Sequence, residues 1–295
     1  MKKFIYSNSN LSGIGDRLLD VMLVLTYANY LDYDKIYLHW KVDNNDMIGD
    51  NSYYSKLRKE KTSFRGIDYL LNNLQNYLTL PSSINFVEND ELEKLKNDNN
   101  NYNFNEHLGL KYTLYSFMNH YKIENKEKFK KLYFENFNKI NFKNIPNEII
   151  NYFKNNDVVT VHLRRGDKVA NDGGTTNNID TSQLEKLNNL TLEKIKLLQK
   201  KGFKYFNFVS DEKNTRDYFI NILKNELECK YFEGDKISQT YFDLYSIAHS
   251  KKILLSQVYS SFSIFASMIN KVELNYFMDH EKINQFCNYK HINKI

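Results

Sequence analysis

The chain has 295 residues, 41% of them hydrophobic, which is enough for one or two domains with a substantial core. Its formal net charge of +5 is too diffuse for a nucleic-acid-binding protein and instead favours anionic ligands or an acidic membrane surface. The two cysteines, Cys229 and Cys287, match no metal-binding spacing, so we expect a reduced, cytoplasmic protein.

The N-terminal sequence predicts no membrane-spanning or secretory segment. Only Phe4, Ile5 and Tyr6 follow the first lysines before the sequence turns polar, which is too short for a signal peptide. The most apolar stretch, residues 18–31, contains Asp20 and is shorter than a bilayer span. It therefore predicts a buried helix, and any membrane association is expected to be peripheral.

The first half of the chain has an irregular pattern. A helix is predicted over 13–31 and a strand over 35–40, followed by helical patterns mixed with Asn-rich loops up to about residue 145. Pro146 separates this region from the first clean strand pattern. We place a domain boundary there, so that residues 1–145 form the first domain.

The second half alternates between strand and helix patterns. Strands are predicted over 157–163, 204–210, 229–232 and 251–255, and helices over 181–201, 213–226, 241–249 and 260–270. This alternation predicts an α/β domain with a parallel, doubly wound sheet over residues 146–275. Residues 276–295 are expected to form a C-terminal tail that packs back on the first domain.

One strand ends in an unusual group of polar side chains, "HLRRGD" at 162–167. Ligands of doubly wound sheets bind at the carboxyl ends of the strands, which is where this group lies. An arginine guanidinium is permanently charged and bidentate, and therefore suits a phosphate or carboxylate. In the structural alternative, both arginines pair with Asp167 and a neighbouring helix. The Arg-Gly-Asp string also matches an adhesion tripeptide, which an intracellular chain would not use.

The sequence contains neither a phosphate loop of the Walker type nor a Gly-x-Gly-x-x-Gly fingerprint. Asp211 and Glu212 are adjacent acidic residues after a strand, a pattern more typical of a helix start than of a metal site. Neutralisation of a phosphate by arginine, without a metal ion, is therefore the expected chemistry.

Four segments together resemble a known family. The segment "HLRRGDKVANDGG" (162–174) resembles the His-x-Arg-Arg-x-Asp-Lys-Val motif of the α-1,6-fucosyltransferases, a group that includes the nodulation enzymes. The α-1,2- and protein O-fucosyltransferases are more distant relatives. The segments at 208–219 and 243–269 resemble later motifs of that group, and "SGIGDRLLD" (12–20) resembles its N-terminal glycine loop. The "YSSFS" within the closing motif is closer to the α-1,2 group, which leaves the linkage open.

The resemblance implies a GT-B fold, in which two Rossmann-like domains face a central cleft. It also implies inverting, metal-independent transfer from a GDP-sugar, with no further cofactor. Arg164 corresponds to the arginine that holds the donor β-phosphate, and Arg165 to a supporting arginine. His162 and Asp243 correspond to residues that contact the guanine and its ribose. For His162, the structural alternative is a histidine satisfied within the strand.

The remaining donor contacts implied by the resemblance come from both domains. Ser260 and Ser261 correspond to phosphate-binding serines, and a helix N-terminus with hydroxyl groups suits a diphosphate on physical grounds as well. A plain helix cap is the structural alternative for each serine. Gly13 and Gly15 would approach the diphosphate from the first domain, unless they only form a tight turn. Asp211 is also expected on the donor side.

The acceptor hydroxyl requires a general base. Asp172 aligns with a family glutamate proposed for that task, and Lys168 aligns with a nearby lysine. Because aspartate is one methylene shorter than glutamate, Asp16 and Asp167 remain alternatives.

The sequence thus predicts a glycosyltransferase that moves fucose, or a related GDP-linked deoxy sugar or heptose, to a glycan or lipid-linked glycan in surface polysaccharide synthesis. Its expected location is cytoplasmic, at most peripheral at the inner membrane face, with no nucleic-acid partner. One alternative is a nucleotide- or glycan-binding protein of the same fold without activity. Another is a different Rossmann-domain enzyme, such as a phosphotransferase.

Overall fold

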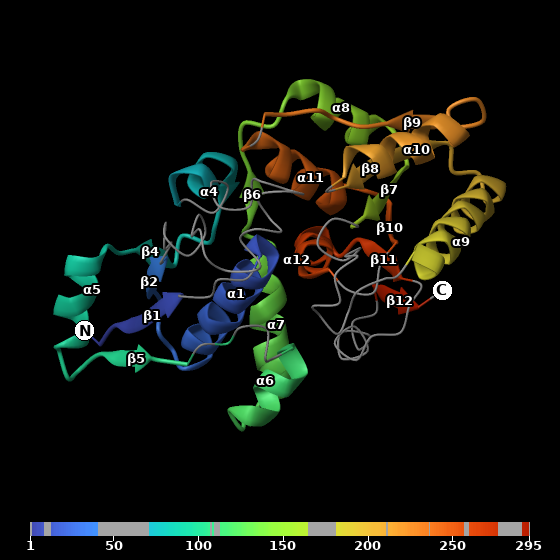
Figure 1. The fold of residues 1–295 in the computed structure, drawn as a ribbon. Helices are drawn as coiled ribbons and strands as arrows, with labels where there is room; N and C mark the ends of the chain where they lie inside the picture. The colour runs from blue at the N-terminus through green and yellow to red at the C-terminus, as the bar shows by residue number, and fades with distance from the viewer. Residues whose placement is uncertain are drawn as a thin grey trace. The chain divides into compact units, whose positions relative to one another are not determined.

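The computed structural model of the chain is mixed α/β, with parallel sheets flanked by helices (Figure 1), as the sequence predicts. The chain divides into two compact domains, the first containing the described residues up to Asn144 and the second those from Ile145 onward. The structure describes residues 2–8, 13–40, 71–106, 108, 113–164, 181–210, 212–235, 237–256, 260–276 and 291–294.

The first domain is built on a parallel sheet with the strand order β4-β2-β1-β5. Its strands are β1 (Phe4–Asn8), β2 (Ile36–Trp40), β4 (Ile84–Phe86) and β5 (Tyr102–Phe104). Helix α1 (Ile14–Tyr30) connects β1 to β2 and is buried along almost its whole length. The helix predicted over 13–31 and the strand predicted over 35–40 are therefore confirmed. Strands β1, β4 and β5 were not predicted.

Short helices and a two-stranded antiparallel sheet complete the first domain. These elements are α4 (Leu71–Tyr77), β3 (Leu78–Thr79), α5 (Asn89–Lys96), α6 (Leu114–His120), α7 (Lys126–Phe137) and β6 (Asn141–Phe142). A capping box between Thr113 and Ser116 begins α6. Asn136 of α7 donates to Thr26 Oγ1 at 3.3 Å, which joins α7 to α1 through a buried hydrogen bond.

The second domain is built on a six-stranded parallel sheet with the order β12-β11-β10-β7-β8-β9. Its strands are β7 (Val158–Leu163), β8 (Tyr205–Ser210), β9 (Glu228–Lys230), β10 (Lys252–Leu255), β11 (Glu273–Tyr276) and β12 (Ile292–Lys294). Its helices are α8 (Asn147–Asn155), α9 (Thr181–Lys200), α10 (Lys213–Leu223), α11 (Ser238–Ala248) and α12 (Ser261–Asn270). The predicted doubly wound sheet is confirmed.

The described residues of the C-terminal segment differ from the prediction. Residues 276–295 were expected to form a tail against the first domain, but β12 pairs in parallel with β11 at the edge of the second domain's sheet. Strand β11 was not predicted either. Both strands are short, and β11 is needed as a partner before β12 can form its backbone hydrogen bonds.

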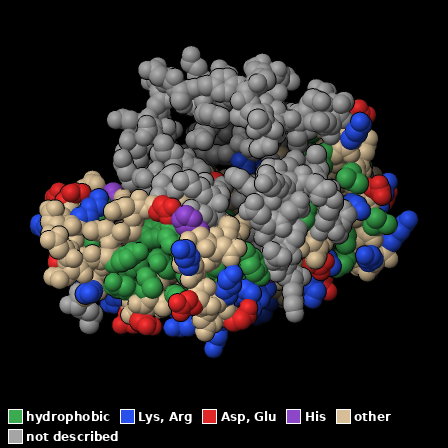
Figure 2. Space-filling model, turned by 90° about the horizontal axis from the view of Figure 1, so that it is seen from below, with side chains coloured by type: hydrophobic (Ala, Val, Ile, Leu, Met, Phe, Trp, Pro, Cys, Tyr) green, Lys and Arg blue, Asp and Glu red, His purple; other side chains and the backbone are tan. Residues whose placement is uncertain are grey.

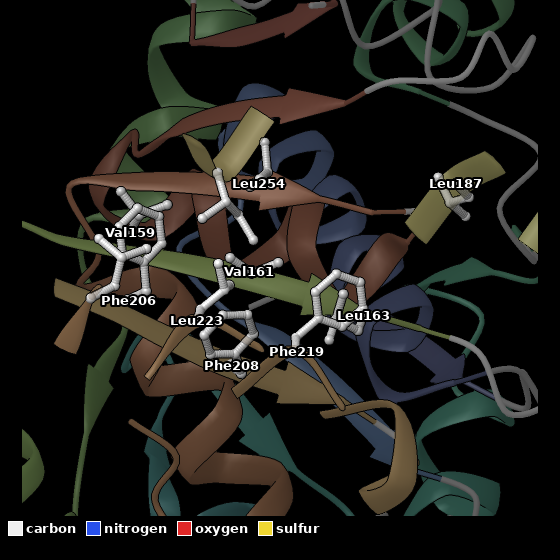
Figure 3. Close-up of a cluster of buried hydrophobic side chains, with 11 residues drawn as sticks. Val159, Val161, Leu163, Leu187, Phe206, Phe208, Phe219, Leu223 and Leu254 are labelled. Atoms are coloured by element: carbon white, nitrogen blue, oxygen red, sulfur yellow. The ribbon is translucent and has the colours of Figure 1, made fainter. Parts of the chain in front are cut away.

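One face of β7 carries the core of the second domain. Val159, Val161 and Leu163 alternate along the strand and pack against phenylalanines of β8 and α10 (Figure 3). Burying each such side chain stabilises the fold by roughly 1.5–3 kcal/mol. The other residues of this buried cluster are Leu187, Ile195, Phe206, Phe208, Phe219, Leu223, Leu227 and Leu254.

Because successive side chains of a strand alternate between faces, Thr160 and His162 lie on the opposite face of β7, together with Val158. Thr160 is fully buried there and donates to the carbonyl oxygen of Ser246 in α11 at 3.3 Å. His162 is the next residue on this face and is directed toward α12, as its hydrogen bond shows below. Helix α10 thus packs on the apolar face of β7, and α11 packs on the face that carries Thr160 and His162.

The surface of the described residues carries both signs of charge. On the face seen in Figure 2, lysine and arginine side chains are interspersed with aspartate and glutamate. None of the described helices combines the length and apolarity that a membrane span requires.

Candidate functional site

The direction of strand succession reverses between β7 and β10. The chain proceeds from β7 to β8 and β9 on one side, and from β10 to β11 and β12 on the other. In open α/β sheets, ligands bind outside the carboxyl ends of the strands at such a reversal. Leu255 of β10 is in register with His162 of β7, so the ends of both strands lie together at this edge.

His162 connects β7 to the N-terminus of α12. Its Nδ1 lies 2.6 Å from the hydroxyl of Ser263, and its side chain is only 5% exposed. The carbonyl oxygen of His162 accepts from the backbone N–H of Ser256, directly after β10, at 3.0 Å. The ring is therefore held in one position at the edge of the sheet, between β7 and α12.

Helix α12 begins with a serine cap. Ser260 has an extended backbone, and its hydroxyl accepts from the backbone N–H of Ser263 at 3.3 Å. The cap that was the structural alternative for Ser260 is therefore present, and Ser261 follows it as the first residue of the helix. The N-terminus of a helix carries partial positive charge and unsatisfied N–H groups, which favour an anion.

Arg164 lies immediately after β7 at the same edge and is half-buried. Because arginine is permanently charged, this edge of the sheet carries a full positive charge as well as the partial charge of the α12 N-terminus. Four other predicted site residues lie outside the described part of the chain: Arg165, Lys168, Asp172 and Asp211. The alternative base Asp167 lies outside it too.

Asp243 lies in the second turn of α11 and forms part of a different cluster. Its Oδ1 accepts from Gln239 Nε2 at 2.8 Å. Tyr231, just after β9, is close enough that the charge of Asp243 contributes to its pKa. The guanidinium of Arg216 lies over the Tyr231 ring, 3.4 Å from its centroid. Asp243 thus contacts the Gln239 amide and lies near the Tyr231 phenol, whose ring in turn stacks with the Arg216 guanidinium.

Tyr231 is neutral in this cluster. Burial and, to a smaller extent, the charge of Asp243 raise its pKa to about 12, against the opposing effect of Arg216. The phenol thus keeps its proton at physiological pH and can donate a hydrogen bond.

The glycine loop of the first domain lies before α1. Gly13 precedes the helix, and its carbonyl oxygen accepts from the N–H groups of Asp16 and Arg17 at 3.0 and 3.2 Å. Gly13 has a φ of −59°, so the turn by itself does not require glycine. Gly15 and Asp16, one of the alternative bases, are buried in the first turn of α1.

Arg17 joins this turn to the ends of two strands. Its guanidinium donates to the carbonyl oxygen of Asn8 at 3.3 Å, while the Asn8 side chain donates to the carbonyl oxygen of Arg17 at 3.2 Å. The same guanidinium lies over the Trp40 ring, 4.0 Å from its centroid. Arg17 is completely buried, and these contacts hold the N-terminus of α1 against the ends of β1 and β2.

The partners of His162 and Asp243 were not predicted from the sequence. Ser263, Gln239, Arg216 and Tyr231 were absent from the predicted site. Ser263 had one recognisable signal, since it stands three residues after the cap residue Ser260, where a capped N–H is expected. Gln239 also had a signal, since it stands four residues before Asp243 in α11 and therefore lies on the same helix face. Tyr231 and Arg216 lie just after β9 and in α10, and only tertiary packing brings Tyr231 close to Asp243 and to Arg216.

Removing the hydroxyl that holds His162 should destabilise the second domain. We expect Ser263→Ala to lower the free energy of unfolding by about 1–3 kcal/mol, because the bond to buried His162 Nδ1 is removed. Urea denaturation would measure this change. Ser267→Ala is the matched control: its hydroxyl donates within α12 to the Ile264 carbonyl oxygen, and the variant should be destabilised by only about 0.5–1.5 kcal/mol. Equal destabilisation of the two variants would contradict a special role for Ser263.

Comparison with solved structures identifies the fold. A NodZ α-1,6-fucosyltransferase structure soaked with GDP-fucose matches with a TM-score of 0.53 and 12% sequence identity, covering 94% of this chain and 95% of that chain. Fucosyltransferase NodZ from Bradyrhizobium, in its selenomethionine form, matches with a TM-score of 0.51, 12% identity and the same coverage. The apo form of POFUT1 matches with a TM-score of 0.50 and 11% identity, covering 94% and 98% of the two chains.

These matches extend over nearly the whole chain and establish the GT-B fold with two Rossmann-like domains. No protein-family model and no curated protein matches the sequence. Among the described residues, no group of three or more His, Cys, Asp or Glu side chains is arranged to hold a metal ion.

Proposed function

We propose that the chain is an inverting glycosyltransferase that moves fucose, or a related GDP-linked deoxy sugar or heptose, from a GDP-sugar to a glycan acceptor. The observation that carries this proposal is the group of residues at the reversal of the second sheet. There Arg164, the His162–Ser263 pair and the N-terminus of α12 combine positive charge with fixed donors, as a diphosphate requires. The fold shared with the fucosyltransferases supports the same conclusion.

In the proposed reaction, the acceptor hydroxyl attacks the anomeric carbon of the sugar while the bond from that carbon to the β-phosphate oxygen breaks. GDP leaves with an additional negative charge on the β-phosphate. A guanidinium fixed at Arg164, supported by Arg165, would stabilise this charge more in the transition state than in the ground state. Ser260 and Ser261 would bind the diphosphate, and no metal ion is required.

The other proposed roles follow the chemistry of each group. Asp243 would accept hydrogen bonds from guanine, and His162 would contact the nucleoside. Gly13 and Gly15 would bind the diphosphate, and Asp211 would also serve on the donor side.

Different residues would act on the acceptor side of the reaction. Asp172, with Lys168 nearby, would remove the proton from the acceptor hydroxyl. The acceptor would be a glycan or lipid-linked glycan in surface polysaccharide synthesis at the cytoplasmic side of a membrane.

Thermal denaturation with nucleotides tests the donor site. We expect GDP to raise the melting temperature in the presence of EDTA, because arginines replace the metal ion in neutralising the diphosphate. A ligand at about one hundred times its dissociation constant stabilises the folded state by about 2.7 kcal/mol. UDP, CMP and ADP are the controls, and they should stabilise less. Equal stabilisation by UDP, or a strict requirement for Mg²⁺, would contradict the proposal.

Turnover separates a transferase from a binding protein of the same fold. A transferase should release GDP from GDP-fucose, or from another GDP-sugar, in the presence of a glycan acceptor. GDP binding with no turnover of any GDP-sugar would instead support the non-catalytic alternative.

A further inference from the structure

Gln239 joins the start of α11 to the loop after β9. Its Nε2 donates to the carbonyl oxygen of Phe232 at 3.1 Å and to Asp243 Oδ1 at 2.8 Å. Its Oε1 accepts from the backbone N–H of Gly234 at 2.7 Å. Gln239 and Asp243 are four residues apart on one helix, so their side chains lie on the same face.

These three bonds determine the orientation of the Gln239 amide. The backbone N–H of Gly234 can only donate, so the atom facing it must be the amide oxygen. The amide nitrogen has two hydrogens, and the Phe232 carbonyl and the Asp243 carboxylate accept them. Rotating the amide by half a turn would break all three bonds, and the nitrogen therefore stays directed at Asp243.

The loop that Gln239 contacts is itself closely packed on α11. A Cβ atom placed on Gly234 would lie 2.6 Å from Ser238 Oγ and 2.9 Å from the Phe242 ring, so any other residue would require Ser238 and Phe242 to shift. Asp235 caps α11 by accepting from the N–H groups of Ile237 and Ser238, and these bonds lower the pKa of its carboxyl group. The two backbone groups that bind Gln239 thus have well-defined positions.

We propose that Gln239 is a positioning residue that orients Asp243 for recognition of the donor base. This inference rests on the proposed function, in which Asp243 accepts from guanine. The Watson–Crick edge of guanine presents two parallel donors, N1–H and the N2 amino group. A carboxylate accepts both only if its plane is correctly oriented, and the bond from Gln239 to Oδ1 sets that plane.

Gln239→Glu is the most informative variant. Glutamate has the same length and can still accept from Gly234, but it cannot donate to Phe232 or Asp243. It also brings a second carboxylate next to that of Asp243. We expect GDP affinity to fall about 10- to 100-fold at about pH 8, the range for removal of a hydrogen bond to a charged group.

Base selectivity is the readout that a purely structural role would not change. Inosine diphosphate lacks the N2 amino group, so the preference of the wild-type protein for GDP over IDP reports the second hydrogen bond of Asp243. In Gln239→Glu this preference should decrease, because affinity for GDP falls more than affinity for IDP. Lowering the pH should protonate one of the two adjacent carboxylates, and GDP affinity should then recover. Isothermal titration with both nucleotides at several pH values would measure these changes.

Four further variants complete the experiment. Gln199→Glu, in the last turn of α9, introduces the same charge in the same domain and should bind both nucleotides like the wild type. Asp243→Asn should lose the preference for GDP, and adding Gln239→Glu to it should reduce GDP affinity little further, because both changes affect one interaction. Gln239→Met provides the same comparison of GDP with IDP without a new charge.

The possible results distinguish the inference from the proposed function. A wild-type protein that does not bind GDP would contradict the proposed function, whatever the variants do. The inference is wrong if the wild type binds GDP but Gln239→Glu keeps the wild-type preference for GDP over IDP. This includes the case in which the affinities for GDP and IDP fall by the same factor. Failure of both Gln239 variants to fold would also overturn it, since Gln239 would then serve stability alone.

Discussion

Arg164→Lys is expected to reduce the rate of sugar transfer roughly a hundredfold or more in a protein that remains folded. Lysine retains the positive charge at the end of β7 but lacks the planar, bidentate fork that matches two phosphate oxygens. Removing one electrostatic interaction with the transition state commonly raises the barrier by about 3–4 kcal/mol. The effect should therefore be larger on kcat than on GDP affinity. Steady-state kinetics with a GDP-sugar and calorimetry with GDP would measure the two effects.

Arg165→Lys is the control for this prediction, and it should weaken transfer without abolishing it. The apolar face of β7, formed by Val159, Val161 and Leu163, is unchanged in both variants, so their melting temperatures should stay near that of the wild type. If Arg164→Lys unfolds the protein while Arg165→Lys is folded but inactive, the roles of the two arginines are reversed. Full activity of Arg164→Lys would show that charge alone is sufficient.

Asp172→Asn is expected to reduce turnover by a factor on the order of 10²–10⁴, the usual effect of removing a general base. Asparagine is nearly the same size but cannot accept the proton of the acceptor hydroxyl. GDP affinity should remain almost unchanged, because the base acts on the acceptor rather than on the donor. Comparing kcat with the GDP dissociation constant tests both parts of the prediction.

Normal turnover in Asp172→Asn would mean that another acidic residue is the general base. Asp16 is then the next candidate, because it lies in the first turn of α1, directly after the glycine loop. Asp16→Asn would be tested in the same assay. Its melting temperature must be compared with that of the wild type, since Asp16 is only 9% exposed and its replacement can also affect folding.

The two predictions concern different parts of the proposed reaction. Arg164 belongs to the second domain, as do the described donor residues His162, Asp243 and Ser260. Variants of these residues should affect nucleotide binding and transfer together. A variant of the base should affect transfer alone, so measuring GDP affinity in every variant separates the two groups.

Elements with a strong local pattern were predicted well from the sequence. The helix predicted over 13–31 is α1 (Ile14–Tyr30), and the strand predicted over 157–163 is β7 (Val158–Leu163). A long apolar periodicity and a run of β-branched residues are visible within one short segment, and they indicate which of its side chains are buried. The α/β class follows from their alternation.

Short strands and helix starts were predicted less well. Strands β5 and β12 have three residues each, too few for a recognisable alternation, and they form because a neighbouring strand offers backbone partners. Helix α11 begins at Ser238 rather than at residue 241, because Asp235 caps N–H groups before the apolar periodicity becomes clear. Each of these features depends on a tertiary or capping interaction rather than on a pattern.

The sequence by itself determined the α/β class, the strand that ends in the arginine pair, and the residue types that suit a diphosphate. These depend on hydrophobic periodicity and on side-chain chemistry, which are properties of neighbouring residues along the chain. Only the tertiary structure decided which distant side chains meet: His162 with Ser263, 101 positions apart, and Tyr231 with Asp243 and Arg216. Strand order and helix packing bring these side chains together, and both are set by the burial of the whole sheet rather than by any single segment.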